Sequence, residues 1–86
     1  MATVVLPRSL VALFPGAERR VEVEATSVAG VLDGLDARWP GMRDRLRDDI
    51  DIRPHINVYV DGDPATLEAA VGAESVVHAI PAVSGG

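Results

Sequence analysis

Two segments near the start of the chain carry strand-like patterns. Residues 20–25 alternate strictly between apolar residues on one phase and charged residues on the other. This period of two predicts a strand with one buried and one solvated face. Residues 3–6 form a largely β-branched run that stops at Pro7, where a strand is expected to end. The two strands are predicted to form a hairpin across the loop between them.

A helical pattern follows the second strand. Thr26 and Ser27 can cap a first turn, and apolar residues then recur at helical spacing, at Val28, Val31, Leu32, Leu35 and Trp39. At about 100° per residue they fall within an arc of about 100°, the width of one helix face against a core. We expect Trp39 to be a core anchor. The opposite, solvated side is expected to hold Gly30, Asp33, Gly34 and Ala37.

Residues 42–53 are rich in arginine and aspartate. Met42, Leu46 and Ile50 are four apart, so this segment is expected to form a short helical turn that leans on the domain. Four carboxylates of the segment could attract a cation, but they lack the alternating ligand spacing and the glycine of a calcium loop. A solvated face of interleaved charges is the favoured interpretation, and no metal site is expected.

The second half of the chain contributes two further strands. Residues 56–60 are the most strand-like run, and the following Asp61-Gly62 is a strong turn signal. Residues 63–73 are expected to form a loop or a short helical segment, and residues 75–80 form the last strand. A hairpin followed by a helix that crosses to a mixed sheet predicts a compact α+β domain.

Composition limits the chemistry that this domain can perform. The chain has 86 residues, of which 48% are hydrophobic and 24% charged, so we expect a single folded domain. With no cysteine, it has no disulfide framework, no cysteine-based metal site and no thiol nucleophile. His55 and His78 lie on different predicted elements, and no nucleophile–base pair is suggested.

Charge and targeting signals narrow the partners. Eight basic and thirteen acidic residues give 8 − 13 = −5, so nucleic acid is not an expected ligand. All of the basic residues are arginines, and lysine is absent. The start of the chain has neither the basic nor the long apolar segment of a signal peptide, and no window approaches a membrane span. We therefore expect a cytoplasmic protein without a membrane partner.

The C-terminus is the segment that most suggests chemistry. Two terminal glycines would occur by chance in about one chain in 200 at average glycine usage. Because glycine has no Cβ, the Gly85-Gly86 end can pass through a channel too narrow for other residues and bring its carboxylate to a reacting atom. A frayed tail or a linker scar is the alternative, and the ending alone puts the two near even.

Three motifs resemble the MoaD/ThiS family of ubiquitin-like sulfur carriers. They are Leu6-Pro7-Arg8-Ser9-Leu10, Ile56-Asn57-Val58-Tyr59-Val60-Asp61-Gly62 and Ile80-Pro81-Ala82-Val83-Ser84-Gly85-Gly86. The resemblance spans nearly the whole chain and favours a functional Gly-Gly end. It implies a ubiquitin-like β-grasp fold, with a mixed sheet packed on one main helix at residues 1–81. An extended C-terminal tail would occupy residues 82–86.

The resemblance also implies a reaction at the last residue. In this family the terminal glycine carboxylate is adenylated and then converted to a thiocarboxylate, which would make Gly86 the reacting group. Gly85 would be the slender neck, and Ala82, Val83 and Ser84 would thread into partners. The domain would be a carrier and not an enzyme, and it would bind no cofactor, because ATP and magnesium are used by the activating enzyme.

Partner binding in ubiquitin-like folds uses outward residues of the last strand. By phase these are His78 and Ile80, with Val77 and Ala79 inward. The opposite phase remains open, because Val76 favours neither face. The implied partners are a ubiquitin-activating-type adenylyltransferase or sulfurtransferase and a sulfur-accepting synthase.

The acceptor could be a cysteine synthase, a pterin or thiazole enzyme, or an enzyme of secondary metabolism. The middle strand and the tail look more like the cysteine-forming type of carrier. Two other functions stay open. One is a protein modifier that is conjugated to other proteins through Gly86, and the other is an interaction module with an inert tail.

Overall fold

The computed structural model describes residues 1–81, and residues 82–86 lie outside the described part. Five strands and three helices follow one another along it. In chain order they are β1 (Ala2–Val5), α1 (Arg8–Val11), β2 (Arg20–Val23), α2 (Val28–Arg38), α3 (Met42–Leu46), β3 (Ile56–Val60), β4 (Asp63–Pro64) and β5 (Val76–Pro81). The predicted α+β class is confirmed.

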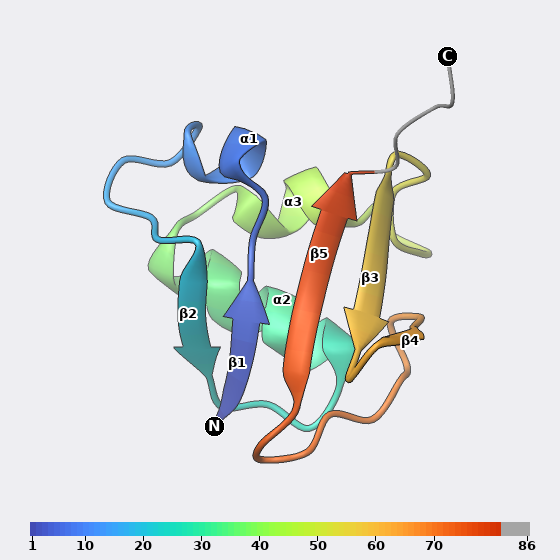
Figure 1. Cartoon of the computed structure of the whole chain (residues 1–86). Helices are drawn as coiled ribbons and strands as arrows, with labels where there is room; N and C mark the ends of the chain where they lie inside the picture. Colours follow the sequence, from blue (N-terminus) through green and yellow to red (C-terminus); the bar gives the residue numbers. More distant parts are fainter. Residues whose placement is uncertain (82–86) are drawn as a thin grey trace.

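The strands form one mixed sheet in the order β2-β1-β5-β3-β4. The first and last strands, β1 and β5, are parallel, and every other neighbouring pair is antiparallel. The main helix α2 crosses one face of the sheet, and the shorter α1 and α3 lie at the end where β5 finishes (Figure 1). The predicted β1–β2 hairpin and the ubiquitin-like β-grasp architecture are both present.

The core forms where the helices cover the sheet. Its most completely buried side chains include Leu6, Leu35, Met42 and Leu46. On β5, Val77 and Ala79 face this core with exposed fractions of 2% and 6%. Their burial confirms the predicted phase of the last strand, because successive side chains of a strand point to opposite faces.

The main helix begins as the sequence predicts. The Ser27 hydroxyl accepts a 3.1 Å hydrogen bond from the backbone N–H of Gly30, which caps the first turn. Four predicted apolar positions are buried, namely Val28, Val31, Leu32 and Leu35. Trp39 ends the helix and packs against the core while remaining partly exposed, so its role as a core anchor is only partial.

Gly34 does not lie on a free solvated side as predicted. A Cβ atom at this position would come within 2.5 Å of Cγ1 of Val23 on β2. The face of α2 that contacts the sheet is therefore wider than the arc formed by its large apolar side chains. A residue without a side chain carries no hydrophobic signal, although it permits this close approach.

Two loop segments also differ from the sequence-based expectation. The connection after β1 contains the short helix α1, whose Leu10 is buried. The segment after α2 forms α3, but this helix ends at Leu46, and Ile50 is 85% exposed instead of leaning on the domain. The chain turns there because the Asp48 carboxylate accepts hydrogen bonds from the backbone N–H groups of Ile50 and Asp51, both at 2.8 Å.

Residues 63–73 hold no helix but begin with the two-residue edge strand β4. The predicted Asp61-Gly62 turn joins it to β3. Both turn residues have a positive φ, 51° and 89°, as a two-residue hairpin turn of this kind requires. Within residues 1–81, no helix has the length and apolar character needed to cross a membrane.

Candidate functional site

The last described strand, β5, is the central strand of the sheet and precedes the predicted tail in the sequence. β5 hydrogen-bonds to β1 on one side and to β3 on the other, so its path is fixed by two neighbours. Its last residue, Pro81, pairs with Ile56 at the start of β3. The predicted tail residues, Ala82, Val83, Ser84, Gly85 and Gly86, lie outside the described residues. The structure therefore shows the base from which the tail starts.

The start of β5 is held by the β3–β4 turn. The Asp61 carboxylate accepts a 2.9 Å hydrogen bond from the backbone N–H of Val76, and the Asp61 N–H donates to the Val76 carbonyl at 2.9 Å. The hydrogen bond from Val76, with a second contribution from Ser75, lowers the pKa of Asp61. β5 is thus anchored at its first residue as well as along both sides.

The sheet face opposite the helices carries an apolar cluster beside the end of β5. The strand register places Val5 of β1, His78 of β5 and Tyr59 of β3 in one row across the sheet. Ile80, with an exposed fraction of 44%, stands one step nearer the tail on the same face. We call Val5, Tyr59, His78 and Ile80 the outer-sheet patch. A shallow, mainly apolar hollow of about 270 Å³ lies among Tyr59, Gly62, His78 and Ile80.

This patch contains both predicted partner-binding residues, His78 and Ile80, and two that were not predicted. Tyr59 and Val5 belong to it only because β3 and β1 flank β5, which cannot be read from the phase of a single strand. The alternation in β3 did carry a usable signal, since Val58 is buried and its neighbour Tyr59 must point the other way.

A basic flank borders the outer-sheet patch on the side of β1. A second hollow, of about 460 Å³, lies between the end of β5 and the segment that follows β1, and its lining includes Arg8, Arg19, Ile80 and Pro81. Arg19 is held in place, because its Nε donates a 3.2 Å hydrogen bond to the Leu6 carbonyl. In a chain with a net charge of −5, two arginines beside the tail base are a local exception.

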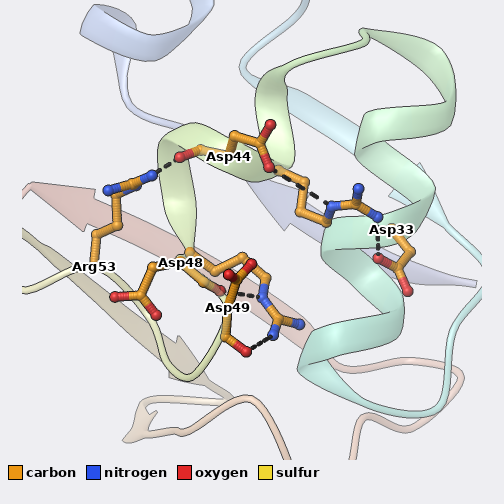
Figure 2. A pocket seen from close by; sticks show the side chains of 7 residues that line it. Asp33, Asp44, Asp48, Asp49 and Arg53 are labelled. Atoms are coloured by element: carbon orange, nitrogen blue, oxygen red, sulfur yellow. Dashed lines mark hydrogen bonds and ion pairs between the residues drawn. The ribbon is translucent and has the colours of Figure 1, made fainter.

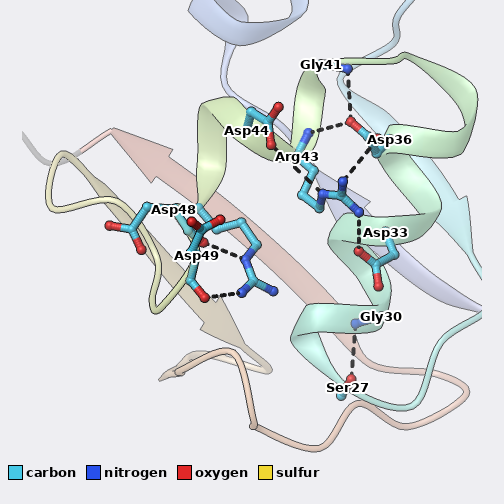
Figure 3. Close-up of polar contacts among 10 residues, drawn as sticks. Ser27, Gly30, Asp33, Asp36, Gly41, Arg43, Asp44, Asp48 and Asp49 are labelled. Carbon is cyan, nitrogen blue, oxygen red and sulfur yellow. Dashed lines mark hydrogen bonds and ion pairs between the residues drawn. The ribbon is translucent and has the colours of Figure 1, made fainter.

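A larger hollow of about 600 Å³ lies on the helix side, but its lining is charged (Figure 2). Arg43 forms its central contacts, with Nη1 at 2.9 Å from Oδ1 of Asp33 and Nη2 at 3.8 Å from Oδ2 of Asp36 (Figure 3). The hydrogen bond to Asp33, followed by the charge of Asp36, raises the pKa of Arg43. These carboxylates are therefore already partnered.

Most of the remaining charges of this hollow are likewise engaged within the chain. Arg47 donates to the backbone carbonyls of Asp48 and Asp49 at 2.9 and 3.2 Å, and Arg53 donates to that of Asp44 (Figures 2 and 3). The pKa of Asp48 is lowered, first by the hydrogen bond from the Asp51 backbone and then by that from Ile50. Among residues 1–81, no three His, Cys, Asp or Glu side chains are grouped to hold a metal ion.

The two histidines are on different elements. His78 lies in the outer-sheet patch, whereas His55 is exposed just before β3. Neither residue forms a catalytic pair with a nucleophile in the described region. What the structure brings together is an exposed, mainly apolar sheet face and a basic flank beside the end of β5.

A mixed sheet grasping one main helix, with an open apolar face beside the last strand, defines the class of small ubiquitin-like carrier and modifier domains. The comparison with protein families identifies the group within this class. The ThiS family profile matches residues 4–86, and the chain belongs to this family.

Individual relatives agree with this assignment. The chain is 34% identical over 71 residues to small archaeal modifier protein 3 of Haloferax volcanii, a match that covers 78% of this chain and 76% of the relative. A chain in the crystal structure of the Amycolatopsis orientalis BexX/CysO complex superposes with a TM-score of 0.88 at 30% identity, and all of both chains is covered. SAMP1 of Haloferax volcanii superposes with a TM-score of 0.75 at 31% identity, covering 99% of this chain and 98% of that one.

Proposed function

We propose that this protein is a sulfur carrier whose C-terminal carboxylate, on Gly86, becomes a thiocarboxylate. The observation that carries the proposal is the family match, which extends from residue 4 to residue 86 and so includes the Gly-Gly end. The strand arrangement supports it, because β5 pairs with β1 as far as His78 and with β3 as far as Pro81. Five further residues reach at most about 17 Å, which is enough to enter the active site of another protein.

The chemistry needs two steps at one carboxyl group. A carboxylate oxygen of Gly86 attacks the α-phosphorus of ATP, and pyrophosphate leaves. Sulfur at the sulfide level then attacks the carbonyl carbon, and AMP leaves with the original oxygen, so that a thiocarboxylate remains. The adenylate is needed because a free carboxylate has no good leaving group. We expect the activating enzyme to bind ATP and magnesium, and the reaction to take place in the cytoplasm.

The outer-sheet patch and the basic flank supply a docking surface for that enzyme. Ile80 and Tyr59 offer apolar contact area, and Arg8 and Arg19 lie beside the end of β5. A partner with an apolar surface rimmed by carboxylates fits this pattern, because complementary charge fixes the orientation of docking. The sulfur acceptor is then a biosynthetic synthase, and the similarity to a chain of the BexX/CysO complex supports a carrier of the cysteine-forming type over a pterin or thiazole carrier.

The test is intact-protein mass spectrometry after incubation with an activating enzyme of the ubiquitin-activating type, ATP, magnesium and sulfide. We expect one oxygen to be replaced by sulfur, and fragmentation to place it on Gly86. A chain lacking Gly85 and Gly86 is the control and must remain unmodified. If sulfur is found elsewhere, or if several activating enzymes leave the chain unchanged, the carrier function is wrong.

A second candidate function is protein modification through Gly86. It is favoured by one observation, the similarity to a small archaeal modifier protein. Because this chain has no lysine, it could not be extended into lysine-linked chains of itself. Conjugates that survive denaturation, without a detectable thiocarboxylate, would support this candidate. If deletion of Gly85 and Gly86 leaves the cellular function intact, both candidates fail and a simple interaction module remains.

A further inference from the structure

The strand β2 has a free edge at one border of the sheet. Within residues 1–81, β2 pairs with β1 alone and forms one border of the sheet, with β1 between it and β5 (Figure 1). The opposite border, β4, is only two residues long and contains a proline. A free strand edge presents unpaired N–H and C=O groups that can pair with another strand.

The orientation of the backbone in β2 follows from two hydrogen bonds. Arg38 Nη2 donates to the Glu22 carbonyl at 2.7 Å from outside the sheet, whereas the Arg19 carbonyl accepts from Leu6 at the β1 side. In an antiparallel ladder the N–H and C=O groups of one residue point to the same side, and the side alternates along the strand. The backbone groups of Arg20 and Glu22 therefore face the free edge.

The side chains of these two residues make the edge complementary to itself. Arg20 and Glu22 are both exposed and lie on the outer face, opposite Val5 and Thr3 of β1. If two copies pair antiparallel about Val21, Arg20 of each copy lies opposite Glu22 of the other. Both residues then exchange backbone hydrogen bonds, and opposite charges meet twice.

The two neighbouring registers, shifted by one residue, place like charges opposite each other. Pairing about Glu22 places Glu22 opposite Glu22, and pairing about Arg20 places Arg20 opposite Arg20, so like charges meet at the centre. Among the registers centred on a residue of β2, only the one centred on Val21 pairs opposite charges at both edge-facing positions of the strand, Arg20 and Glu22. Two-fold symmetry is satisfied as well, since the same surface serves both copies.

We propose that β2 is a self-association edge, through which two copies form one continuous sheet, and that Arg38 restrains the association. Its guanidinium occupies the Glu22 carbonyl that the Arg20 N–H of a second copy would use. The hydrogen bond is exposed, so it can be exchanged. A shallow hollow of about 350 Å³ between β2 and the residues Arg38 and Trp39 leaves space beside the edge for this displacement.

The association is weak but leaves the carrier surfaces free. A four-residue edge buries less than the roughly 1,200 Å² of a stable interface, so we expect a dissociation constant on the order of 1 mM. β1 separates β2 from β5, and the outer-sheet patch remains accessible in both copies. The proposal is independent of sulfur transfer, and its test requires no activating enzyme.

The test measures self-association of the full chain by sedimentation equilibrium and by amide chemical shifts, between about 0.05 and 2 mM. We expect concentration-dependent shifts at the amides of Arg20 and Glu22. Arg38→Ala should lower the dissociation constant about threefold to tenfold, since it removes a competing hydrogen bond. Arg45→Ala is the matched control, because it removes the same charge from an exposed position on α3 and should leave association unchanged.

Charge-reversal substitutions distinguish pairing in this register from nonspecific association. Arg20→Glu and Glu22→Arg should each abolish self-association, because like charges then meet. An equimolar mixture of these two variants should form a heterodimer, in which each carboxylate again lies opposite an arginine. If the Arg38→Ala variant remains monomeric at 2 mM, the proposal is wrong. It is also wrong if the two charge variants show no association when mixed.

Discussion

The outer-sheet patch and the charged segment from Arg43 to Arg53 are both hollowed surfaces, yet they differ in what they leave unsatisfied. The charged segment has the larger hollow, but most of its arginines and aspartates pair with one another or with nearby backbone groups. The patch has smaller hollows, with apolar side chains open to solvent on the most firmly held strand. Unsatisfied surface on a rigid element, and not the size of a hollow, marks the better docking site.

The largest expected effect tests whether the charged segment is purely structural. Leu46 ends α3 and is completely buried. Leu46→Ala should lower the free energy of unfolding by about 3 kcal/mol, through lost burial and the cavity that remains. Denaturant unfolding measures the change. Among the molecules that remain folded, thiocarboxylate formation should proceed at the normal rate, and a slower reaction there would give this segment a direct role in docking.

A smaller effect separates the two surfaces by a matched pair of substitutions. Ile80→Asp places a charge in the outer-sheet patch and should slow activation about thirtyfold, as expected when an apolar anchor of an interface is lost. Ile50→Asp makes the same change at a more exposed isoleucine in the charged segment and should alter the rate less than twofold. The measurement is the initial rate of thiocarboxylate formation at limiting carrier concentration. Equal effects of both substitutions would remove the distinction.

The ion pairs of the charged segment should contribute little to stability. The Arg43 side chain is 42% exposed, and its partner Asp33 is 60% exposed. Arg43→Ala is expected to change the free energy of unfolding by less than about 1 kcal/mol, because solvent screens such pairs. The comparison of unfolding curves at low and high salt checks this, since the small difference should shrink further as salt is added. A large loss that salt leaves untouched would show a packing role for the arginine stem.

The smallest expected effect is a dependence of stability on pH. It involves one aspartate of the charged segment and one that holds the start of β5. Asp48 in the charged segment and Asp61 in the β3–β4 turn, which holds the start of β5, have a lowered pKa, each chiefly because of backbone hydrogen bonds. A group whose folded pKa lies below its unfolded value, about 3.9, stabilises the protein above that value. The contribution should be lost as the pH falls through the folded pKa. Asp61→Asn and Asp48→Asn should each flatten the stability profile in this acidic range, as thermal unfolding between about pH 2 and 5 would reveal. Unchanged profiles would show that these hydrogen bonds do not survive in solution.

Much of the candidate site could be predicted from residues that are close in the sequence. The alternation in β5 indicated that Val77 and Ala79 face inward and that His78 and Ile80 face outward, and their burial agrees. The spacing of apolar residues in α2 also indicated its buried face. Both patterns work because the geometry of a single strand or helix is enough to assign its faces.

Other parts could not be predicted, because they depend on neighbours distant in the chain. Val5 joins His78 through a parallel pairing of the first and last strands, and no local pattern encodes that pairing. The close approach of Gly34 to Val23 is equally invisible, since glycine adds nothing to a hydrophobic pattern. Ile50 was misplaced because a helical spacing of four was extended past the point where Asp48 turns the chain.

The sequence by itself therefore determined the faces of β5, the large buried side chains of α2, the family motifs and the candidate chemistry at Gly86. Only the tertiary structure decided which strands flank β5, which side chains complete the outer-sheet patch and which edge of the sheet is free. The physical reason is that the face of an element follows from its own backbone period. A docking surface is the sum of several elements, and it exists only after nonlocal pairing has brought them together.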